Sequence, residues 1–284
     1  MKLTEGILQI DSETIQQKIT RFIKDYVRKT KTKGIVLGIS GGVDSATAAA
    51  LSTIAIGADR VLALFMPEEE THIETDDQHI KLLSKEFKFQ LLTVDLTQIL
   101  STLYGTIPDF NLKDKLSRGN LKARTRMLIW YYYANSKNRI VVGSSDKSET
   151  MLGYCTKWGD AAADIAPVMD LYKTQVRQLA NHIGIPLEII KKPSTPALWP
   201  NQMAEKELGM KYETLDLILY GLEHFMLPQK IAEQLNLPTE TIVDIKEKWL
   251  RAEHKRRMPL TTKLKYRTIN ADFRLARTIK GDLH

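Results

Sequence analysis

Two hydrophobic patterns alternate along this chain of 284 residues. Between residues 13 and 29, apolar side chains recur every three or four positions, which is the spacing of an amphipathic helix. Four short runs are instead almost continuously apolar and rich in β-branched residues, a pattern typical of strands that are buried on both faces. We predict these strands at residues 34–39, 60–66, 89–94 and 139–143.

Predicted helices separate these strands along the chain. The alanine-rich segment 46–56 has a high intrinsic helix propensity. Gly184 and Pro186 mark the end of a later helix, because glycine commonly terminates helices and proline cannot continue them. The other predicted helices cover residues 74–87, 119–136 and 172–184. This alternation favours an α/β fold, with a doubly wound parallel sheet that is flanked by helices on both faces.

The last third of the chain has a different pattern from the rest. After residue 193 it is helical, and Pro228 and Pro238 divide it into short helices. No internal repeat or break in composition separates it from the preceding residues. We therefore expect a single domain over residues 1–284, with three parts: an N-terminal helix within 1–33, an α/β core at 34–192 and a helical C-terminal part at 193–284.

Composition narrows the class of protein. The formal net charge is +7, which favours anionic partners such as nucleotides, but the basic residues are spread along the chain and form no long tail. We therefore expect no nucleic-acid partner. No apolar stretch approaches the roughly 20 residues that span a membrane, and the N-terminus lacks the pattern of a secretory signal. We expect a cytoplasmic protein without a membrane partner.

The loop between the first predicted strand and the following helix carries the clearest chemical signal. It reads Ser40-Gly41-Gly42-Val43-Asp44-Ser45. Without side chains on two residues, its backbone amides are free to turn toward a phosphate, and the helix N-terminus favours the same anion. Asp44 would repel phosphates unless it holds Mg²⁺, which bridges to their oxygens. The alternative is a Gly-Gly turn that Asp44 and Ser45 cap at a helix start.

Two common phosphate-binding patterns do not fit this loop. No lysine follows the glycines as in the GxxxxGK[ST] loop, which disfavours transfer of the γ-phosphate, and the GxGxxG dinucleotide pattern is absent. The SGGVDS motif instead resembles the pyrophosphate-binding loop of the ATP-pyrophosphatase superfamily. That resemblance implies an enzyme that adenylates a carboxylate, carbonyl or urea-like oxygen, and splits ATP to AMP and pyrophosphate.

Four later segments narrow the resemblance to one family. RGNLKARTRM at 118–127, the long segment 141–177 that contains KSETMLGYCTKWGD, the segment 192–216 and EHKRRMP at 253–259 resemble NAD⁺ synthetase in order and spacing. The resemblance implies a ligase that amidates deamido-NAD⁺. ATP adenylates the nicotinate carboxylate, ammonia attacks the acyl-adenylate, and NAD⁺, AMP and pyrophosphate leave.

The resemblance also implies roles for individual residues. The phosphates of ATP are expected at Gly38, Ile39, Ser40, Gly41, Gly42, Val43, Asp44 and Ser45. Further contacts to ATP are expected from Ser144, Lys173 and Thr195, and contacts to deamido-NAD⁺ from Arg124, Lys157, Asp164, His254 and Lys255. Asp44 and Glu149 are the expected Mg²⁺ ligands. The expected catalytic residues are Asp44, Lys173 and Asp160, of which Asp160 would position or deprotonate ammonia.

Some of these residues have ordinary alternative interpretations. Lys122, Arg124 and Arg126 form a basic helix face, which is usually solvated or paired with acids, and Glu149 alone is typical of a solvated helix residue. Cys155 is the only cysteine, which excludes a disulfide within one chain; most lone cysteines are small buried hydrophobic residues.

The sequence departs from the family at two places. It has GSSDKSE where the family commonly has GTGNKSE, so that Ser144 replaces a threonine and keeps its hydroxyl. It also has GDAAAD in place of GDGGAD. If residues 161–162 require positive φ, each alanine lowers the stability of the protein by about 1 kcal/mol relative to glycine. We therefore expect a somewhat different loop path near the nicotinate end of the site.

The nitrogen source is predicted to be free ammonia. The first strand begins near residue 35, which leaves no room before it for a fused glutaminase domain, and Cys155 lies within the synthetase segment rather than in a glutaminase motif. Members of the family are generally homodimers, and the apolar, aromatic residues 128–133 are a candidate contact, although they fit a core equally well. Two rival functions stay open: a tRNA-modifying ATP-pyrophosphatase, and a nucleotide-binding protein without catalysis.

Overall fold

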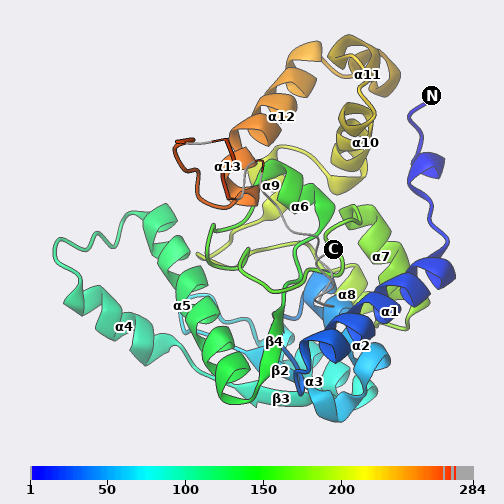
Figure 1. Ribbon diagram of the computed structural model, residues 1–284. Helices are drawn as coiled ribbons and strands as arrows, with labels where there is room; N and C mark the ends of the chain where they lie inside the picture. The colour runs from blue at the N-terminus through cyan, green and yellow to red at the C-terminus, as the bar shows by residue number, and fades with distance from the viewer. Residues whose placement is uncertain (1, 265, 270–271, 273–284) are drawn as a thin grey trace.

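A parallel four-stranded sheet lies at the centre of the computed structural model, which describes residues 2–264, 266–269 and 272 (Figure 1). The strand order is β3-β2-β1-β4. β1 pairs with β2 through Ile35 and Val61, and with β4 through Ile35 and Ile140. The strands are β1 (Gly34–Gly38), β2 (Val61–Phe65), β3 (Gln90–Thr93) and β4 (Arg139–Val142). Each lies within the range predicted from its apolar run.

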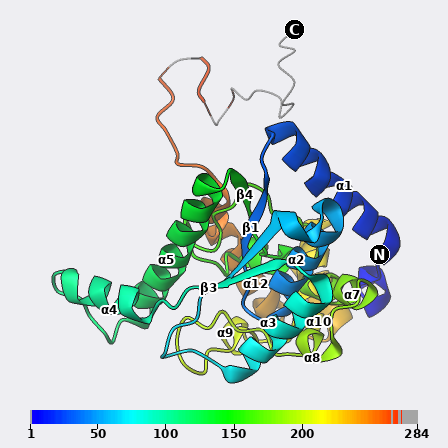
Figure 2. The same cartoon turned by 90° about the horizontal axis from the view of Figure 1, so that it is seen from below.

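Helices cover both faces of the sheet (Figure 2). Successive residues of a strand point to opposite faces of the sheet. In β1, Ile35 and Leu37 pack against the helices on one face, and Val36 packs against those on the other. The first set comprises α1 (Ser12–Thr30), α2 (Val43–Ile56), α3 (Glu74–Phe87) and α7 (Lys173–His182). The opposite face is covered by α5 (Lys115–Ser136), and α4 (Thr97–Thr106) projects beyond it. The predicted doubly wound α/β fold is therefore confirmed.

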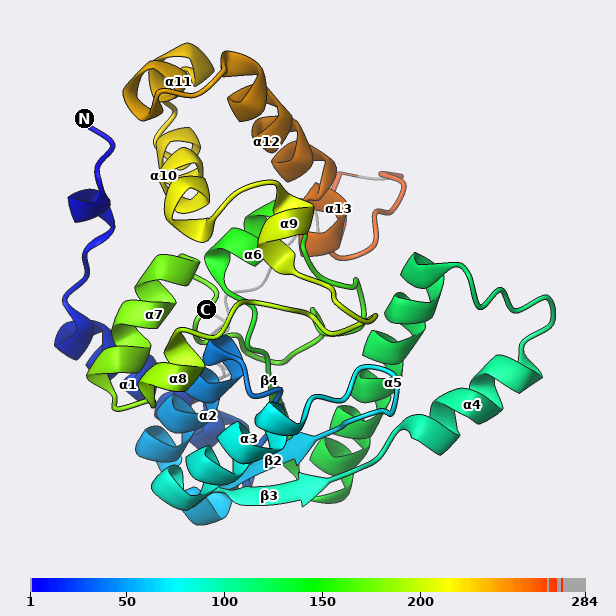
Figure 3. The same ribbon diagram turned by 180° about the vertical axis from the view of Figure 1, so that it is seen from behind.

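The C-terminal helices have a hydrophobic core of their own, to which Leu3 and Leu8 also contribute. Figure 3 shows them as a layer above the sheet. Pro228 is the first residue of a helix and Pro238 directly precedes another, positions at which proline's fixed φ and missing N–H are tolerated. These helices are α9 (Ala204–Leu208), α10 (Tyr212–Glu223), α11 (Pro228–Leu235), α12 (Thr239–Arg251) and α13 (Glu253–Arg256).

Short helices account for most differences from the predicted elements. The stretch 143–164, predicted as a loop, contains α6 (Lys147–Leu152), which begins after the N-cap Asp146 and ends at Gly153 with φ 63°. α4 was not predicted either. The remaining short elements are η1 (Glu5–Leu8), η2 (Ala58–Arg60) and α8 (Leu187–Ile190). The predicted division at residue 192 stays a prediction, and part of 193–284 lies outside the described residues.

The chain order creates a crevice at one edge of the sheet. From β1 the chain winds through β2 to β3 in one direction, and it then returns to place β4 on the other side of β1. In open α/β sheets the loops after two such strands diverge, and ligands bind at the carboxyl ends of the strands there. The loop 40–45 follows β1, and residues 143–149 follow β4. Among the described residues, no helix is both long enough and apolar enough to cross a membrane.

Candidate active site

A cavity of about 570 Å³ opens at this edge of the sheet. Its volume lies within the range of small-molecule sites, roughly 300–1,000 Å³. Its wall combines segments that are distant in sequence, from the ends of β1, β2 and β4 to residues 192–199. The predicted site residues on the wall are Gly38, Ile39, Ser40, Gly42, Val43, Asp44, Ser45, Ser144, Glu149, Asp160, Thr195 and Lys255.

The loop 40–45 is shaped to expose backbone amides at one end of the cavity. Gly41 has φ 74°, and a Cβ there would lie 3.2 Å from Asp76 Oδ1, so both conformation and space favour glycine. Ser45 Oγ accepts a hydrogen bond of 3.2 Å from Ser40 N and donates one of 3.1 Å to Gly42 O. Gly42 precedes α2 and supplies no capping side chain. The first N–H groups of α2 are therefore available to an anion.

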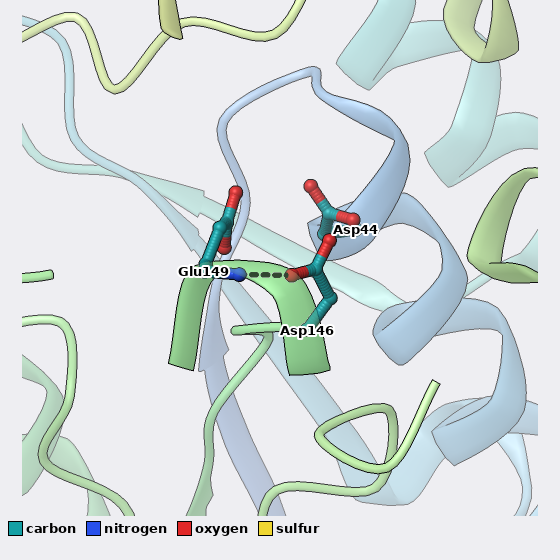
Figure 4. A group of neighbouring side chains, drawn as sticks. All are labelled: Asp44, Asp146 and Glu149. Carbon is teal, nitrogen blue, oxygen red and sulfur yellow. Dashed lines mark hydrogen bonds between the residues drawn. The ribbon is translucent and has the colours of Figure 1, made fainter. Parts of the chain in front are cut away.

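Three carboxylates surround one ammonium group below this loop. Lys173 Nζ lies 2.5 Å from Asp44 Oδ2, 2.8 Å from Glu149 Oε1 and 3.0 Å from Asp146 Oδ2. Figure 4 shows the carboxylates pointing toward one another from α2 and from the start of α6. Burial and the neighbouring acids raise the pKa of Asp146, although Lys173 opposes this. Burial lowers the pKa of Lys173, but the three carboxylates outweigh it and raise that pKa well above its usual value.

The carboxylate cluster fits a divalent cation. One oxygen from each of Asp44, Asp146 and Glu149 lies within 4.8 Å of the others. Among the described residues, Asp44 Oδ1 is buried without a hydrogen-bond partner, and the buried Asp146 Oδ2 has the Lys173 ammonium 3.0 Å away. The cluster sets three carboxyl groups against one ammonium group. Carboxylate oxygens are the ligands that Mg²⁺ prefers.

Asp146 is the member of this cluster that sequence reasoning missed. Its Oδ1 accepts a hydrogen bond of 2.7 Å from Glu149 N, as an N-cap does. An acid three residues before Glu149, after a predicted strand, was the available signal for a helix start here. Asp146 therefore fixes the helix that carries Glu149 and adds a carboxylate to the same cluster.

A buried carboxylate from the C-terminal helices bonds the helix starts that carry Glu149 and Lys173. Asp216 on α10 is fully buried and accepts hydrogen bonds from Ser148 Oγ at 2.6 Å and Thr174 N at 2.9 Å. Ser148 Oγ accepts a further bond of 3.1 Å from Lys173 N. Asp216 thus joins the starts of α6 and α7, next to Glu149 and Lys173. Sequence reasoning did not find Asp216, because only the fold brings it there.

Asp160 and Cys155 also line the cavity. Asp160 Oδ1 accepts a hydrogen bond of 2.8 Å from Thr156 N, and burial raises the pKa of Asp160. Burial also raises the pKa of the Cys155 thiol to about 11, so it is protonated at neutral pH and a poor nucleophile. Lys255 Nζ donates to Gly153 O at 2.6 Å and to Cys155 O at 2.7 Å, which ties α13 to this loop.

Not every predicted site residue reaches the cavity wall. Lys173 is buried beneath it, and Gly41 and His254 are not among the residues that line it. Arg124 is exposed and donates to Lys157 O at 3.2 Å. Asp164 Oδ2 accepts a bond of 2.7 Å from Val141 N. Arg124 and Lys157 thus contact each other outside the cavity wall, and the Asp164 carboxylate bonds the backbone of β4.

The structure decides between the alternatives left open for residues 161–162 and for the basic face of α5. Ala161 and Ala162 do not have positive φ; the left-handed residue there is Trp158, with φ 62°. The alanines therefore carry none of the backbone strain that positive φ would impose. Of the two alternatives for the basic face of α5, solvation or pairing with acids, Lys122 follows the second: it is fully buried and bonds Glu68 Oε1 at 2.5 Å.

Several wall residues were not predicted as site residues at all. They are Glu68, Asp76, Arg126, Trp130 and Lys192. Trp130 explains one of the glycines, because a Cβ on Gly38 would lie 2.5 Å from Trp130 Cζ2. Each of these side chains lies far along the chain from the loop 40–45, so local sequence patterns carry no signal for their position.

Comparisons with known proteins agree with this arrangement. The NAD synthase family model matches residues 15–259. The NH(3)-dependent NAD(+) synthetase of Methanocaldococcus jannaschii is 44% identical over 254 residues, which cover 89% of this chain and 97% of that relative. The enzyme of the same name from Hyperthermus butylicus is 42% identical, with 91% and 94% covered.

Solved structures show the same similarity in three dimensions. The NH3-dependent NAD synthetase of Campylobacter jejuni superimposes with a TM-score of 0.75 at 30% identity, covering 89% of this chain and 100% of that one. The NMN synthetase of Francisella tularensis superimposes with a TM-score of 0.79 at 29% identity, covering 89% and 99%. The family model and these relatives show that the chain belongs to the NAD synthase family.

Proposed function

We propose that this protein is an ammonia-dependent NAD⁺ synthetase, which amidates deamido-NAD⁺ through an acyl-adenylate and releases AMP and pyrophosphate. The observation that carries the proposal is the cluster of Asp44, Glu149 and Lys173 beside the loop 40–45 in a cavity of nucleotide size. Relatives of 42–44% identity that bear the name NH(3)-dependent NAD(+) synthetase support it.

ATP binding is assigned to the carboxyl edge of β1 and β4. The amides of residues 40–45 hold the phosphates, and Ser144 and Thr195 offer hydroxyls from the same cavity wall. Asp44 and Glu149 would hold Mg²⁺, whose charge would offset that of the phosphates. Lys173 supplies the second positive charge and keeps the metal-binding carboxylates in place.

A separate set of residues is assigned to the second substrate, and of these only Lys255 lies on the cavity wall. Arg124, Lys157, Asp164, His254 and Lys255 are proposed to bind deamido-NAD⁺. Asp160 is proposed to orient ammonia or to take its proton, and the raised pKa of its buried carboxyl suits a base. Adenylation is needed because a carboxylate is a poor electrophile, and AMP is a good leaving group for the attack by ammonia.

A homodimer is proposed through α4 and α5. Leu116, Leu128 and Tyr132 on α5 are more than 60% exposed, and Ile99 on α4 and Ile107 directly after it are also exposed. Contiguous exposed apolar residues mark interaction sites on soluble proteins. A second copy covering these helices would lie beside Arg124. Light scattering after size exclusion tests the proposal: a monomer at micromolar concentration contradicts it.

The activity is tested with purified protein, ATP, Mg²⁺ and deamido-NAD⁺, with ammonium or glutamine as the sole nitrogen source. We expect formation of NAD⁺, AMP and pyrophosphate in equal amounts with ammonium. Glutamine-dependent turnover at or above the ammonium rate would refute the proposed nitrogen source. Absence of pyrophosphate release with every acceptor would favour a nucleotide-binding protein without catalysis, and RNA-dependent release would favour a tRNA-modifying enzyme.

The similarity to an NMN synthetase makes the mononucleotide a second candidate acceptor. The same assay with nicotinate mononucleotide in place of deamido-NAD⁺ separates the two. We expect kcat/KM to be higher for deamido-NAD⁺. A preference for the mononucleotide would assign the chain to NMN synthesis by the same adenylation chemistry.

A further inference from the structure

Arg126 lines the cavity from α5, on a wall different from that of the carboxylate cluster. α5 covers one face of the sheet, whereas Asp44 lies in the first turn of α2, which covers the other. The guanidinium of Arg126 lies against the end of β2, where Nε and Nη2 each reach Met66 O at 3.4 Å. Both distances are long for N–H···O hydrogen bonds.

The acids near Arg126 are already engaged by other cations. Glu68 accepts from Lys122 Nζ at 2.5 Å. Glu70 accepts from Lys122 at 2.7 Å and from Arg118 Nη2 at 2.6 Å. Among the described residues, no carboxylate lies within ion-pair distance of Arg126. Its five N–H donors therefore have one shared acceptor, a carbonyl oxygen.

The other cations of the cavity wall are better satisfied. Lys192 forms an ion pair with Asp76. Lys255 donates to two carbonyl oxygens at 2.6 and 2.7 Å. Burial lowers the pKa of Arg126, and Glu68 and Asp160 oppose this only at longer range. A partly buried guanidinium without a close acceptor is costly unless an anion joins it.

We infer that Arg126 is a substrate-binding residue, whose free N–H donors hold an oxyanion that a substrate brings into the cavity. The inference rests on the proposed function, in which two oxyanions enter: a phosphate of ATP and the pyridine carboxylate of deamido-NAD⁺. Both match the planar fork of a guanidinium, which forms two parallel hydrogen bonds to such groups. The binding experiment distinguishes the two sources.

The test compares Arg126→Gln and Arg126→Lys with the wild type. Calorimetry measures the Kd of ATP with Mg²⁺ and, separately, the Kd of deamido-NAD⁺. Arg126→Gln removes a charged hydrogen-bond donor. We expect this to raise one of the two Kd values about tenfold or more. Arg126→Lys keeps the charge but not the fork, so about a three- to tenfold loss is expected. A loss for ATP assigns the phosphate, and a loss for deamido-NAD⁺ assigns the carboxylate.

Arg139→Gln is the matched control. Arg139 also donates to backbone carbonyls at long distance, 3.3 Å to Ile35 O and 3.4 Å to Asp59 O, but at the start of β4, the opposite end of the sheet. The affinities of the Arg139→Gln variant for both substrates are expected to stay within twofold of those of the wild type. Kd values within twofold of wild type for both substrates in both Arg126 variants would overturn the inference.

Folding and the proposed function are monitored separately. Circular dichroism checks each variant, and if Arg126→Gln does not fold, the Lys variant decides by the same twofold criterion. A wild type that binds ATP but forms no NAD⁺ would refute the proposed function alone. In that case, the comparison of ATP affinity between wild type and variants still tests Arg126 as a phosphate ligand.

Discussion

Asp216 accepts a 2.6 Å hydrogen bond from Ser148 Oγ across 68 positions of sequence. Through this bond and the one from Thr174 N, a single buried carboxylate of the C-terminal helices holds the starts of α6 and α7 together. Asp216 accepts from the Thr174 N–H, one of the first amides of α7, which have no partner within the helix. Glu149 and Lys173 are the adjacent residues, so the C-terminal helices help to set the geometry of the carboxylate cluster.

Asp216→Ala is therefore expected to lower both stability and catalysis. It leaves the Ser148 hydroxyl and the Thr174 amide without their acceptor. Each unsatisfied buried group lowers the free energy of unfolding by about 1–3 kcal/mol. Urea denaturation measures the loss of stability, and pyrophosphate release measures kcat and the KM for ATP. Asp216→Asn retains one acceptor and should recover part of both.

A Ser148→Ala variant completes the comparison. In a double-mutant cycle the effects of Asp216→Ala and Ser148→Ala should fall short of additivity, because the two side chains share one hydrogen bond. Fully additive effects on the KM for ATP would show that Asp216 does not act through Ser148.

Asp44→Ala is expected to abolish pyrophosphate release while the fold is retained. Asp44 is partly exposed at the edge of the cavity, and α2 keeps its buried apolar residues. The variant loses one proposed Mg²⁺ ligand and one of the three partners of Lys173. Thermal unfolding checks the fold, and activity within a few-fold of wild type would contradict the proposed metal role.

Asp146→Asn tests whether the third carboxylate takes part in metal binding. Asparagine caps helices as well as aspartate does, so α6 should be retained while one negative charge is removed. We expect a weaker apparent affinity for Mg²⁺, measured as the concentration that half-saturates pyrophosphate release. The matched control is Asp114→Asn, since Asp114 caps α5 through Ser117 N at 3.0 Å outside the cluster. An equal Mg²⁺ requirement in both variants would limit Asp146 to its capping role.

The thiol of Cys155 is predicted to be unreactive and dispensable. Burial raises its pKa to about 11, so the thiolate fraction is small at pH 7 and grows about tenfold per pH unit until that pKa is reached. Alkylation by iodoacetamide should follow this rise, measured by mass spectrometry, while Cys155→Ser retains turnover. Rapid alkylation at pH 7, or loss of turnover in the Ser variant, would contradict a purely structural thiol.

The sequence predicts the sheet well and the cavity only partly, for physical reasons that differ. Strands such as β1 are buried on both faces, so a continuous apolar run identifies them without knowledge of their neighbours. Lys122 and Arg124 look alike on a helix, yet one is fully buried and the other exposed. Their difference depends on Glu68, 54 residues from Lys122, and such a distant pairing leaves no local pattern.

Gly38 shows how the cavity depends on a close approach between β1 and α5. A Cβ there would lie 2.5 Å from Trp130 Cζ2 and 2.9 Å from its Nε1, so Gly38→Ala forces the indole away from the cavity wall. Overpacking of this kind is expected to destabilise the protein by about 1–3 kcal/mol, and the displaced ring should also raise the KM for ATP. Chemical denaturation and pyrophosphate release measure the two effects.

Gly105→Ala on α4 is the matched control, because no atom lies within 4 Å of the added Cβ and alanine favours helix by about 0.5–1 kcal/mol. Equal stability changes in the two variants would show that the indole has room to move, and that the contact with Trp130 does not constrain residue 38.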